Sequence, residues 1–450
     1  MDEHVHHPPG PRRVAVVGAG PAGLFTADEL VRQDRLPVTV DLLERLPVPF
    51  GLVRYGVAPD HPKIKAVTRS LQKIVEHPRV RFLGGVGFGA ELDREDLLRH
   101  YDAVVYAAGA PADRGLGIPG ESSPGCHPAT AFVSWYSGHP DAGPPFALDA
   151  RHAVVVGAGN VALDVARVLA KPARALERTD MPQPVLDALA VSKVTDITVL
   201  VRRGPEHTRF TTKELRELDE LDGVAIRVPP GEAEPGGGPL DRTAENNLAL
   251  FRSWTGEPAA GTERTITFRF WRRPVEVRGT PSVRELIVER TRLDASGALT
   301  GTGEREVLPA GLVLRSVGYR GLPLPGVPFD HERGVIRNAG GRVVDEAGEP
   351  CPREYVAGWL KRGPSGVIGT NRMDAAETVA LMVEDLIGDR NGSGGPPIDA
   401  LLRERGISPV TLDGWRRIDA AEIELGRRAG RERTKITDWA ELRRLGGVPG

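Results

Sequence analysis

Two copies of one local pattern constrain this chain most: a short apolar run, a glycine-rich turn and an amphipathic helix. The first copy reads RRVAVVGAGPAGLFTADELVR, with its apolar run over 13–17 and glycines at Gly18, Gly20 and Gly23. In a strand–turn–helix unit the first glycine makes the tight turn, the second lets backbone approach a pyrophosphate, and the third packs helix on strand. The sequence therefore predicts a nucleotide-binding crossover unit at this point.

An acidic residue follows the first turn at the spacing of a ribose-binding carboxylate. The run VTVDLLER ends near Glu44, 21 residues after Gly23, where a spacing of about 20 is typical. A carboxylate there accepts hydrogen bonds from ribose hydroxyls and repels a 2′-phosphate. This half is predicted to bind FAD or NAD; the alternative is a surface glutamate at a strand end.

The pattern recurs as RHAVVVGAGNVALDVARVLA, with a predicted strand over 152–156. Its third glycine position is alanine, which satisfies the same packing requirement. Asp164 lies on the first turn of the helix that follows. The residues predicted to approach a nucleotide here are Gly159, Asn160, Val161 and Ala162.

The strand after the second motif ends in two arginines, Arg202 and Arg203, where an NAD site would have an acid. Guanidinium groups match phosphate oxygens, so this half is predicted to bind NADP; the alternative is that both arginines only solvate the strand end. They follow Ala162 by 40 residues or more, which indicates an insertion, KPARALERTDMPQPVLDALAVSK. One site is thus predicted to bind a nucleotide without a 2′-phosphate and the other a nucleotide that carries one. This pairing implies a bound flavin and a diffusing nicotinamide whose rings meet at about 3–3.5 Å.

Charge and cysteine content exclude several other classes of protein. Lys and Arg total 59 against 61 Asp and Glu, so no overall attraction to nucleic acid or an anionic membrane is expected. Cys126 and Cys351 form no Cys-x-x-Cys, which excludes a disulfide framework and a four-cysteine cluster within the chain. They indicate a reducing, cytoplasmic compartment, and neither a signal peptide nor a membrane span is apparent. No metal site is predicted, since the histidines of MDEHVHHPPG fit a disordered tail better.

The order of the motifs predicts an α/β fold with two Rossmann-like, three-layer nucleotide-binding domains, the second inserted in the first. Two apolar runs that end in small residues, YDAVVYAAGA and AGLVLRSVGYRG, mark the exit from the first domain and the return to it. The expected divisions are a disordered tail 1–12, a first domain 13–112 and 322–390, a second domain 113–321, a linker 391–397 and a helical extension 398–450.

The last segment of the first domain and the extension carry two further signals. In EYVAGWLKRGPSGVIGTNR, Trp359 can stack on a flavin, and the glycine-rich turn can donate N–H groups to it; the alternative is a buried tryptophan and an ordinary turn. In the extension, Leu412, Trp415 and Ile418 form an apolar stripe. We expect this stripe to dock on the first domain, rather than the extension presenting basic groups to an acidic partner.

Taken together, these motifs resemble the adrenodoxin-reductase-like ferredoxin–NADP reductases, in particular their bacterial NADPH–ferredoxin reductase branch. The matching segments, from Val14 to Leu386, are GAGPAG, ERLPVPFGLVRYGVAPDHPKIK, VVVGAGNVALDVAR, VRRGPEHTRFTTKELREL, LRSVGYRG and AGWLKRGPSGVIGTN. The resemblance implies a non-covalent FAD, reduction by NADPH, and a ferredoxin or similar acidic iron–sulfur protein as partner. Trp359 replaces the aspartate of the wider disulfide-reductase superfamily, which argues against disulfide chemistry.

The resemblance also implies site residues. For FAD they are Ala22, Glu44, Leu52, Val86, Trp359, Gly366, Val367 and Ile368. For NADP they are Arg114, Gly159, Asn160, Val161, Ala162, Arg202, Arg203, Glu214 and Gly366. The implied catalytic residues near the nicotinamide are His61, Glu214 and Asp164. Judged without the resemblance, His61 is a turn histidine and Glu214 belongs to a solvated helix face.

Other functions stay open at the level of sequence. They are an NADPH-dependent flavin monooxygenase, a nucleotide-binding redox sensor without turnover, and an electron-transfer subunit of a larger iron–sulfur enzyme. For an acidic partner, a basic patch near the flavin is expected, with candidates Arg209, Arg216, Lys361 and Arg362.

Overall fold

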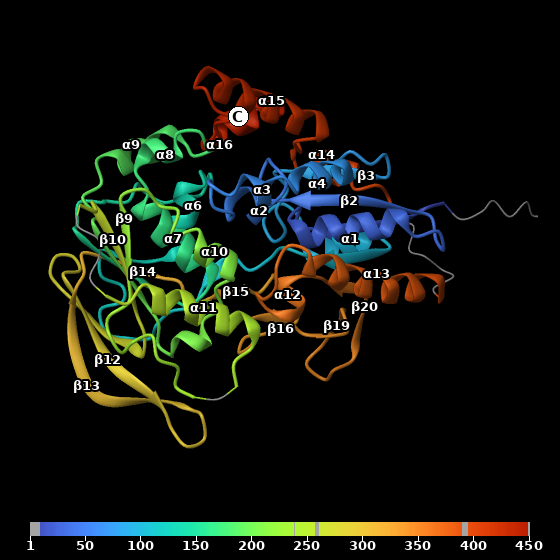
Figure 1. The fold of residues 1–450 in the computed structure, drawn as a ribbon. Coiled ribbons are helices and arrows are strands. Elements are labelled where there is room, and N and C mark those ends of the chain that lie inside the picture. Colours follow the sequence, from blue (N-terminus) through green and yellow to red (C-terminus); the bar gives the residue numbers. More distant parts are fainter. Residues whose placement is uncertain (1–9, 238, 257–260, 389–394, 449–450) are drawn as a thin grey trace, which may run out of the picture.

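The chain forms two lobes, seen side by side in the computed structural model, which describes residues 10–237, 239–256, 261–388 and 395–448 (Figure 1). The first lobe is built on a seven-stranded sheet that is parallel apart from an antiparallel edge. In spatial order its strands are β18 (Asn338–Ala339), β19 (Arg342–Val344), β20 (Pro350–Val356), β4 (Ala103–Tyr106), β1 (Arg12–Val17), β2 (Val38–Glu44) and β3 (Val80–Gly84).

Strand β1 separates two apolar cores, as a fully buried parallel strand must. Val14 and Val16 face one core, and Ala15 and Val17 face the other. The helices of this lobe are α1 (Pro21–Arg32), α2 (Leu52–Tyr55), α3 (Pro62–Lys65), α4 (Thr68–Val75), α5 (Arg94–His100), α12 (Trp359–Arg362) and α13 (Thr370–Gly388). Helices α1 and α13 cover the first core and α5 covers the second. The lobe therefore has the three layers that the sequence predicts.

The second lobe contains a six-stranded sheet in which every pair of neighbours is parallel. Its order is β6 (Cys126–Pro128), β14 (Leu312–Arg315), β7 (His152–Val156), β8 (Asp196–Leu200), β10 (Arg264–Arg269) and β9 (Val224–Arg227). The helical elements are α6 (Ala129–Tyr136), α7 (Asn160–Ala170), α8 (Ala173–Leu176), α9 (Gln183–Ala190), the 3-10 turn η1 (Pro205–His207), α10 (Thr212–Arg216) and α11 (Arg242–Ser253). The predicted insertion after the second motif thus contains α8 and α9.

The two faces of this second sheet are covered differently. Ala153 and Val155 pack with helices α6, α7 and α11. Val154 and Val156 pack instead against an antiparallel sheet of β11 (Arg272–Arg278), β12 (Glu285–Leu293) and β13 (Leu299–Pro309). A β-layer therefore stands where a helical layer would complete a simple Rossmann unit.

The chain crosses between the lobes on one short antiparallel pair, β5 (Ala112–Asp113) with β15 (Tyr319–Arg320). It leaves the first sheet after β4 and returns to it as β18, and a small hairpin, β16 (Phe329–Asp330) with β17 (Val335–Ile336), lies on the return path. This connectivity agrees with an inserted second unit, whose limits stay a prediction.

The C-terminal extension is helical, with α14 (Asp399–Glu404), α15 (Leu412–Arg428) and α16 (Trp439–Gly446). Trp415 and Ile418 are buried in the first core, and Leu412 packs against it. Gly84 of β3 and Val410 exchange backbone hydrogen bonds of 2.8 and 2.7 Å, so the extension also pairs with the sheet edge. The extension therefore docks on the first lobe as the apolar stripe predicts.

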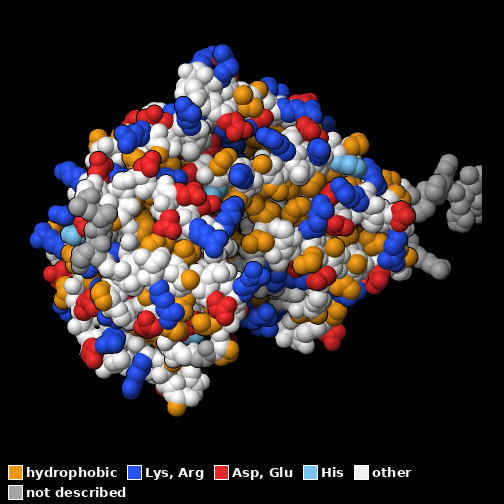
Figure 2. Space-filling view, in the orientation of Figure 1, with side chains coloured by type: hydrophobic (Ala, Val, Ile, Leu, Met, Phe, Trp, Pro, Cys, Tyr) orange, Lys and Arg blue, Asp and Glu red, His pale blue; other side chains and the backbone are white. Residues whose placement is uncertain are grey.

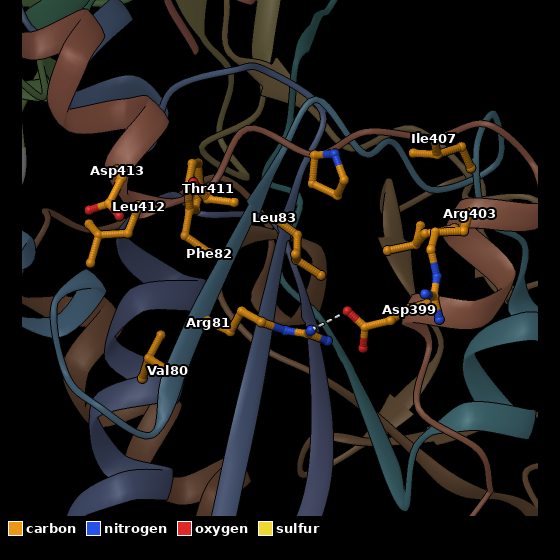
Figure 3. A pocket seen from close by; sticks show the side chains of 12 residues that line it. Val80, Arg81, Phe82, Leu83, Asp399, Arg403, Ile407, Thr411, Leu412 and Asp413 are labelled. Atoms are coloured by element: carbon orange, nitrogen blue, oxygen red, sulfur yellow. Dashed lines mark hydrogen bonds and ion pairs between the residues drawn. The ribbon is translucent and has the colours of Figure 1, made fainter. Parts of the chain in front are cut away.

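A pocket of about 570 Å³ lies between β3 and the extension (Figure 3). Arg81 and Asp399 form an ion pair of 2.7 Å across it. No predicted site residue lines this pocket.

The predicted tail and linker fall mostly outside the described residues, which omit 1–9 and 389–394. Strand β1 begins at Arg12, one residue earlier than the sequence suggests. Within the described ranges, no helix combines the length and apolarity needed to cross a membrane.

Candidate functional site

The first glycine turn is shaped so that only one of its glycines faces open space. A Cβ on Gly18, whose φ is +108°, would lie 2.6 Å from the Ala107 carbonyl oxygen, and one on Gly23 would lie 1.8 Å from the Gly18 oxygen. Both positions therefore exclude a side chain. A Cβ on Gly20 would meet nothing nearer than the Gly51 Cα, at 4.0 Å. The open position is the one through which a pyrophosphate would approach backbone N–H groups of α1.

Glu44 is held against this turn by backbone donors. Its carboxylate accepts hydrogen bonds from the amides of Ala19 (2.8 Å) and Leu46 (3.0 Å), and burial raises its pKa. The carbonyl of Glu44 accepts a hydrogen bond from the amide of buried Val86, at 2.9 Å. The geometry fits a ribose site, because each carboxylate oxygen keeps a lone pair for a hydroxyl.

The late glycine-rich segment is packed onto the same turn. A Cβ on Gly358, whose φ is +74°, would lie 2.4 Å from the Ala22 Cβ, so α12 begins directly beside α1. The half-buried Trp359 ring lies 5.2 Å from the Tyr319 ring, centre to centre. Val367 is 69% exposed and Leu52 is 38% exposed, and Figure 2 shows a strip of apolar side chains along this side of the first lobe. Large apolar side chains left in solvent indicate a surface that a ligand covers.

In the second glycine turn, too, one glycine is packed against backbone and another faces open space. A Cβ on Gly157 would lie 2.3 Å from the Ser316 oxygen, whereas one on Gly159 would meet nothing within 4 Å. Asn160 at the start of α7 accepts a hydrogen bond of 2.9 Å from the Thr211 amide through its side-chain oxygen. Thr211 caps α10. This contact holds α10 over the N-terminal end of α7, where Val161 and Ala162 also lie.

Arg202 and Arg203 project from a fixed backbone. The Arg202 carbonyl accepts from the Thr291 hydroxyl at 2.7 Å, and the Arg203 carbonyl accepts from the Trp271 amide at 3.1 Å. Arg202 is exposed and Arg203 half-buried, and within the described part of the chain neither guanidinium forms a salt bridge. Both are therefore free to bind an anion. Arg114, also exposed, lies elsewhere, just after β5 in the crossing between the lobes.

The two turns are connected through His61, which lies at the contact between the lobes. From Gly51, beside Gly20, the chain runs through α2 to His61, which is 7% exposed. His61 Nε2 lies 3.1 Å from the Asp164 Oδ1 on α7 of the second lobe. The structure thus brings together two of the three predicted catalytic residues across the lobes.

The third, Glu214, lies nearby, but on its own segment another carboxylate contacts the histidine. His61 Nδ1 lies 3.6 Å from the Glu217 Oε2. Burial and the neighbouring Asp164 charge raise the pKa of Glu214, whose Oε2 is buried without a hydrogen-bond partner. Sequence reasoning missed Glu217, although it follows Glu214 by three residues and so shares its helix face. The unpaired Glu214 oxygen indicates a donor supplied by a ligand.

Two further residues of this cluster were also missed. They are Asp60 and Arg167. Arg167 of α7 contacts His61, Asp164 and Asp60, and its side chain is 1% exposed.

The predicted basic patch for an acidic partner is partly wrong. Lys361 is buried and pairs with Asp374 at 3.0 Å, so it is not available to a partner.

Comparison with known proteins identifies the family of this chain. The family described as pyridine nucleotide-disulphide oxidoreductase matches residues 12–228. NADPH-ferredoxin reductase FprA of Mycobacterium tuberculosis is 42% identical over 97% of this chain and 99% of that protein. Mitochondrial NADPH:adrenodoxin oxidoreductase of Arabidopsis thaliana is 37% identical over 96% of this chain and 95% of that protein.

Solved structures extend the match to the fold. FprA of M. tuberculosis in complex with NADPH superposes with a TM-score of 0.91 at 42% identity, covering 97% of this chain and all of that one. The resemblance inferred from the motifs is confirmed. The chain belongs to the adrenodoxin-reductase-like NADPH–ferredoxin reductases.

Proposed function

We propose that this protein is an FAD-dependent NADPH–ferredoxin reductase. One observation carries the proposal: His61 from the first lobe meets Asp164 on the helix of the second glycine turn at 3.1 Å. The segments that follow the two nucleotide turns are therefore in direct contact. An enzyme that passes electrons between two nucleotides needs this arrangement.

We assign FAD to residues 13–112 with 322–390, and NADP to 113–321. FAD, bound without a covalent link, supplies the ability to take a hydride and to release electrons one at a time. Glu44 binds the FAD ribose, and the open face at Gly20 receives the pyrophosphate. Leu52, Trp359 and Val367 exclude water from the reacting rings.

In the second lobe, Arg202 and Arg203 bind the 2′-phosphate that distinguishes NADPH from NADH. The open turn at Gly159 receives the pyrophosphate. Glu214, with its unpartnered oxygen, accepts a hydrogen bond from the nicotinamide carboxamide, and His61 with Asp164 fixes the ring beside it. Neither His61 nor Glu214 has to transfer a proton for this role.

The electrons leave to an acidic iron–sulfur protein of the ferredoxin type. Lys and Arg side chains surround the apolar strip in Figure 2, and Arg209 and Arg216 are exposed. Steering of an acidic partner by such a surface weakens as salt screens it. We place the reaction in the cytoplasm, because two free cysteines far apart in sequence, Cys126 and Cys351, fit a reducing compartment.

The test is an absorbance spectrum of the purified protein followed by anaerobic stopped-flow mixing with NADPH. We expect a flavin spectrum that bleaches on mixing, then reduction of added ferredoxin with little oxygen consumption. A colourless protein that takes up no FAD contradicts the proposal. Oxygen consumption that exceeds ferredoxin reduction favours the monooxygenase alternative.

The same assay tests the site residues. His61→Gln and Glu214→Ala should each change the rate of flavin reduction or the affinity for NADPH. An exposed substitution at a distance, Arg428→Gln, serves as the control and should change neither. Flavin reduction that is unaltered in both site variants would remove these residues from the nicotinamide site.

A further inference from the structure

Arg167 is a buried cation at the contact between the lobes to which the proposed function assigns no role. Its Nε and Nη2 donate to the two carboxylate oxygens of Asp60 at 2.8 and 3.0 Å. Lys171 Nζ donates to the same Asp60 at 2.6 Å. This bidentate contact joins α7 of the second lobe to the turn before α3 of the first, and so fixes the plane of the guanidinium.

The same nitrogen, Nη2, also lies 2.6 Å from His61 Nε2. A guanidinium can only donate hydrogen bonds and keeps its proton in proteins. At this distance, the contact is a hydrogen bond only if Nε2 carries no hydrogen, since otherwise two N–H groups would point at each other. Nη2 has two hydrogens: one serves the Asp60 contact, and the other is shared between His61 Nε2 at 2.6 Å and Asp164 Oδ1 at 2.8 Å. Because two N–H groups this close would repel each other, the arrangement favours Nε2 as an acceptor.

The contact with Asp164 would instead need a hydrogen on this ring nitrogen. Its Oδ1 lies 3.1 Å from His61 Nε2 and would accept a hydrogen from it. The same oxygen also accepts from Arg167 Nη2 at 2.8 Å, so Arg167 supplies it with a donor whether or not His61 does. One ring nitrogen cannot accept from Arg167 and donate to Asp164 at once, and the contact with Arg167 is the shorter of the two.

We propose that Arg167 is a positioning residue that keeps Nε2 of His61 unprotonated and places the ring hydrogen on Nδ1. Nδ1 faces the side of α10, with the Glu217 carboxylate 3.6 Å away. The consequence for catalysis rests on the proposed function. His61 then offers a single fixed donor on the side where Glu214 and Glu217 lie, rather than a ring that exchanges donor and acceptor.

The direct test is ¹⁵N NMR of the FAD-loaded protein labelled in its histidines, at pH 7.5. The His61 signals are assigned by their loss in His61→Gln. We expect Nε2 in the range of an unprotonated ring nitrogen and Nδ1 in the range of a protonated one. A protonated Nε2, with or without a proton on Nδ1, would overturn the proposal. This readout does not depend on turnover, so it stands even if the proposed function fails.

The second test changes the arginine itself. In Arg167→Met we expect the hydrogen to move to Nε2, toward Asp164, and flavin reduction by NADPH to slow at least tenfold. A His61 spectrum in Arg167→Met that matches the wild type would overturn the proposal. If this variant does not fold, Asp60→Asn loosens the same guanidinium from its other edge and should shift the spectrum in the same direction. An unshifted spectrum there would overturn the proposal equally.

A matched control exists at the same end of this helix. Arg264 Nη1 donates to the carbonyls of Ala170 (3.0 Å) and Lys171 (2.8 Å) at the C-terminal end of α7. Arg264→Met disturbs α7 without touching His61. It should leave the His61 spectrum and the flavin reduction rate within twofold of the wild type. A shift in this control as large as that in Arg167→Met would overturn the specific role of Arg167.

Discussion

Replacing Lys435 with methionine tests whether the C-terminal extension holds the two lobes together. The Lys435 side chain is 1% exposed. Its ammonium donates to the carbonyl of Arg54 in the first lobe at 2.9 Å and to that of Ser137 in the second at 2.7 Å. It also pairs with Asp180 of the second lobe at 3.1 Å. Figure 1 shows α15 and α16 lying over this junction.

The expected loss of stability in Lys435→Met follows from the hydrogen bonds that each partner of the lysine loses. Methionine fills most of the lysine volume but donates nothing, so two carbonyls lose a charged donor, at about 1–3 kcal/mol each. Asp180 is not left unpaired, because Lys65 Nζ still donates to both of its oxygens at 2.6 and 2.7 Å. Removing a buried charge returns part of the loss. We therefore expect a net destabilisation of roughly 2–4 kcal/mol at pH 6.

The destabilisation caused by Lys435→Met should grow as the pH rises. Burial lowers the pKa of Lys435 from 10.5 to about 7. At pH 6 the amine is protonated in both states, so titration adds little. Between about pH 7 and 10.5 the folded protein releases a proton that the unfolded chain keeps, so wild-type stability gains roughly 1.4 kcal/mol per pH unit. The variant lacks this gain, so the difference widens above pH 7.

The assay is guanidinium denaturation of the FAD-loaded protein at pH 6 and pH 8.5, followed by flavin fluorescence and by circular dichroism. Using both probes reveals whether the lobes unfold together. Lys63→Met, at an exposed lysine of α3, is the control and should change stability by less than about 0.5 kcal/mol. A loss below about 1 kcal/mol for Lys435→Met would refute the bridging role. An equal loss of stability at both pH values would refute the lowered pKa of Lys435.

Two further outcomes are expected. Arg202→Gln with Arg203→Gln should lower the preference for NADPH over NADH by roughly 30- to 1,000-fold, since two partly exposed charge-assisted contacts contribute about 2–4 kcal/mol together; an unchanged ratio of the kcat/KM values would place the 2′-phosphate elsewhere. Lysine and arginine partners hold the pKa of Asp60 and Asp180 below 3.8. Their stabilisation is therefore complete above about pH 4 and lost as the pH falls further, so in acid denaturation Asp60→Asn and Asp180→Asn should each show a shallower loss than the wild type.

The sequence by itself determined the parts of this protein that depend on neighbours along the chain. Gly18 and Gly23 stand at fixed positions of the motif, because the backbone of a strand–turn–helix unit leaves no room for a Cβ there. The spacing to Glu44 reflects the length of one helix and one strand. The apolar stripe around Trp415 predicted docking because a helix with one apolar face has to bury it. Local periodicity and turn geometry thus predicted both nucleotide turns and the layers of the first lobe.

Only the tertiary structure decided which charged groups meet. His61 and Asp164 are separated by 103 residues, and Lys435 and Arg54 by 381. No spacing rule covers such separations. Reasoning from the sequence accordingly missed Glu217, whose carboxylate lies 3.6 Å from His61 Nδ1, and it offered Lys361 as a surface charge although that side chain is buried. The physical reason is that the packing of the lobes, not the local chain, fixes the distances over which hydrogen bonds and ion pairs act.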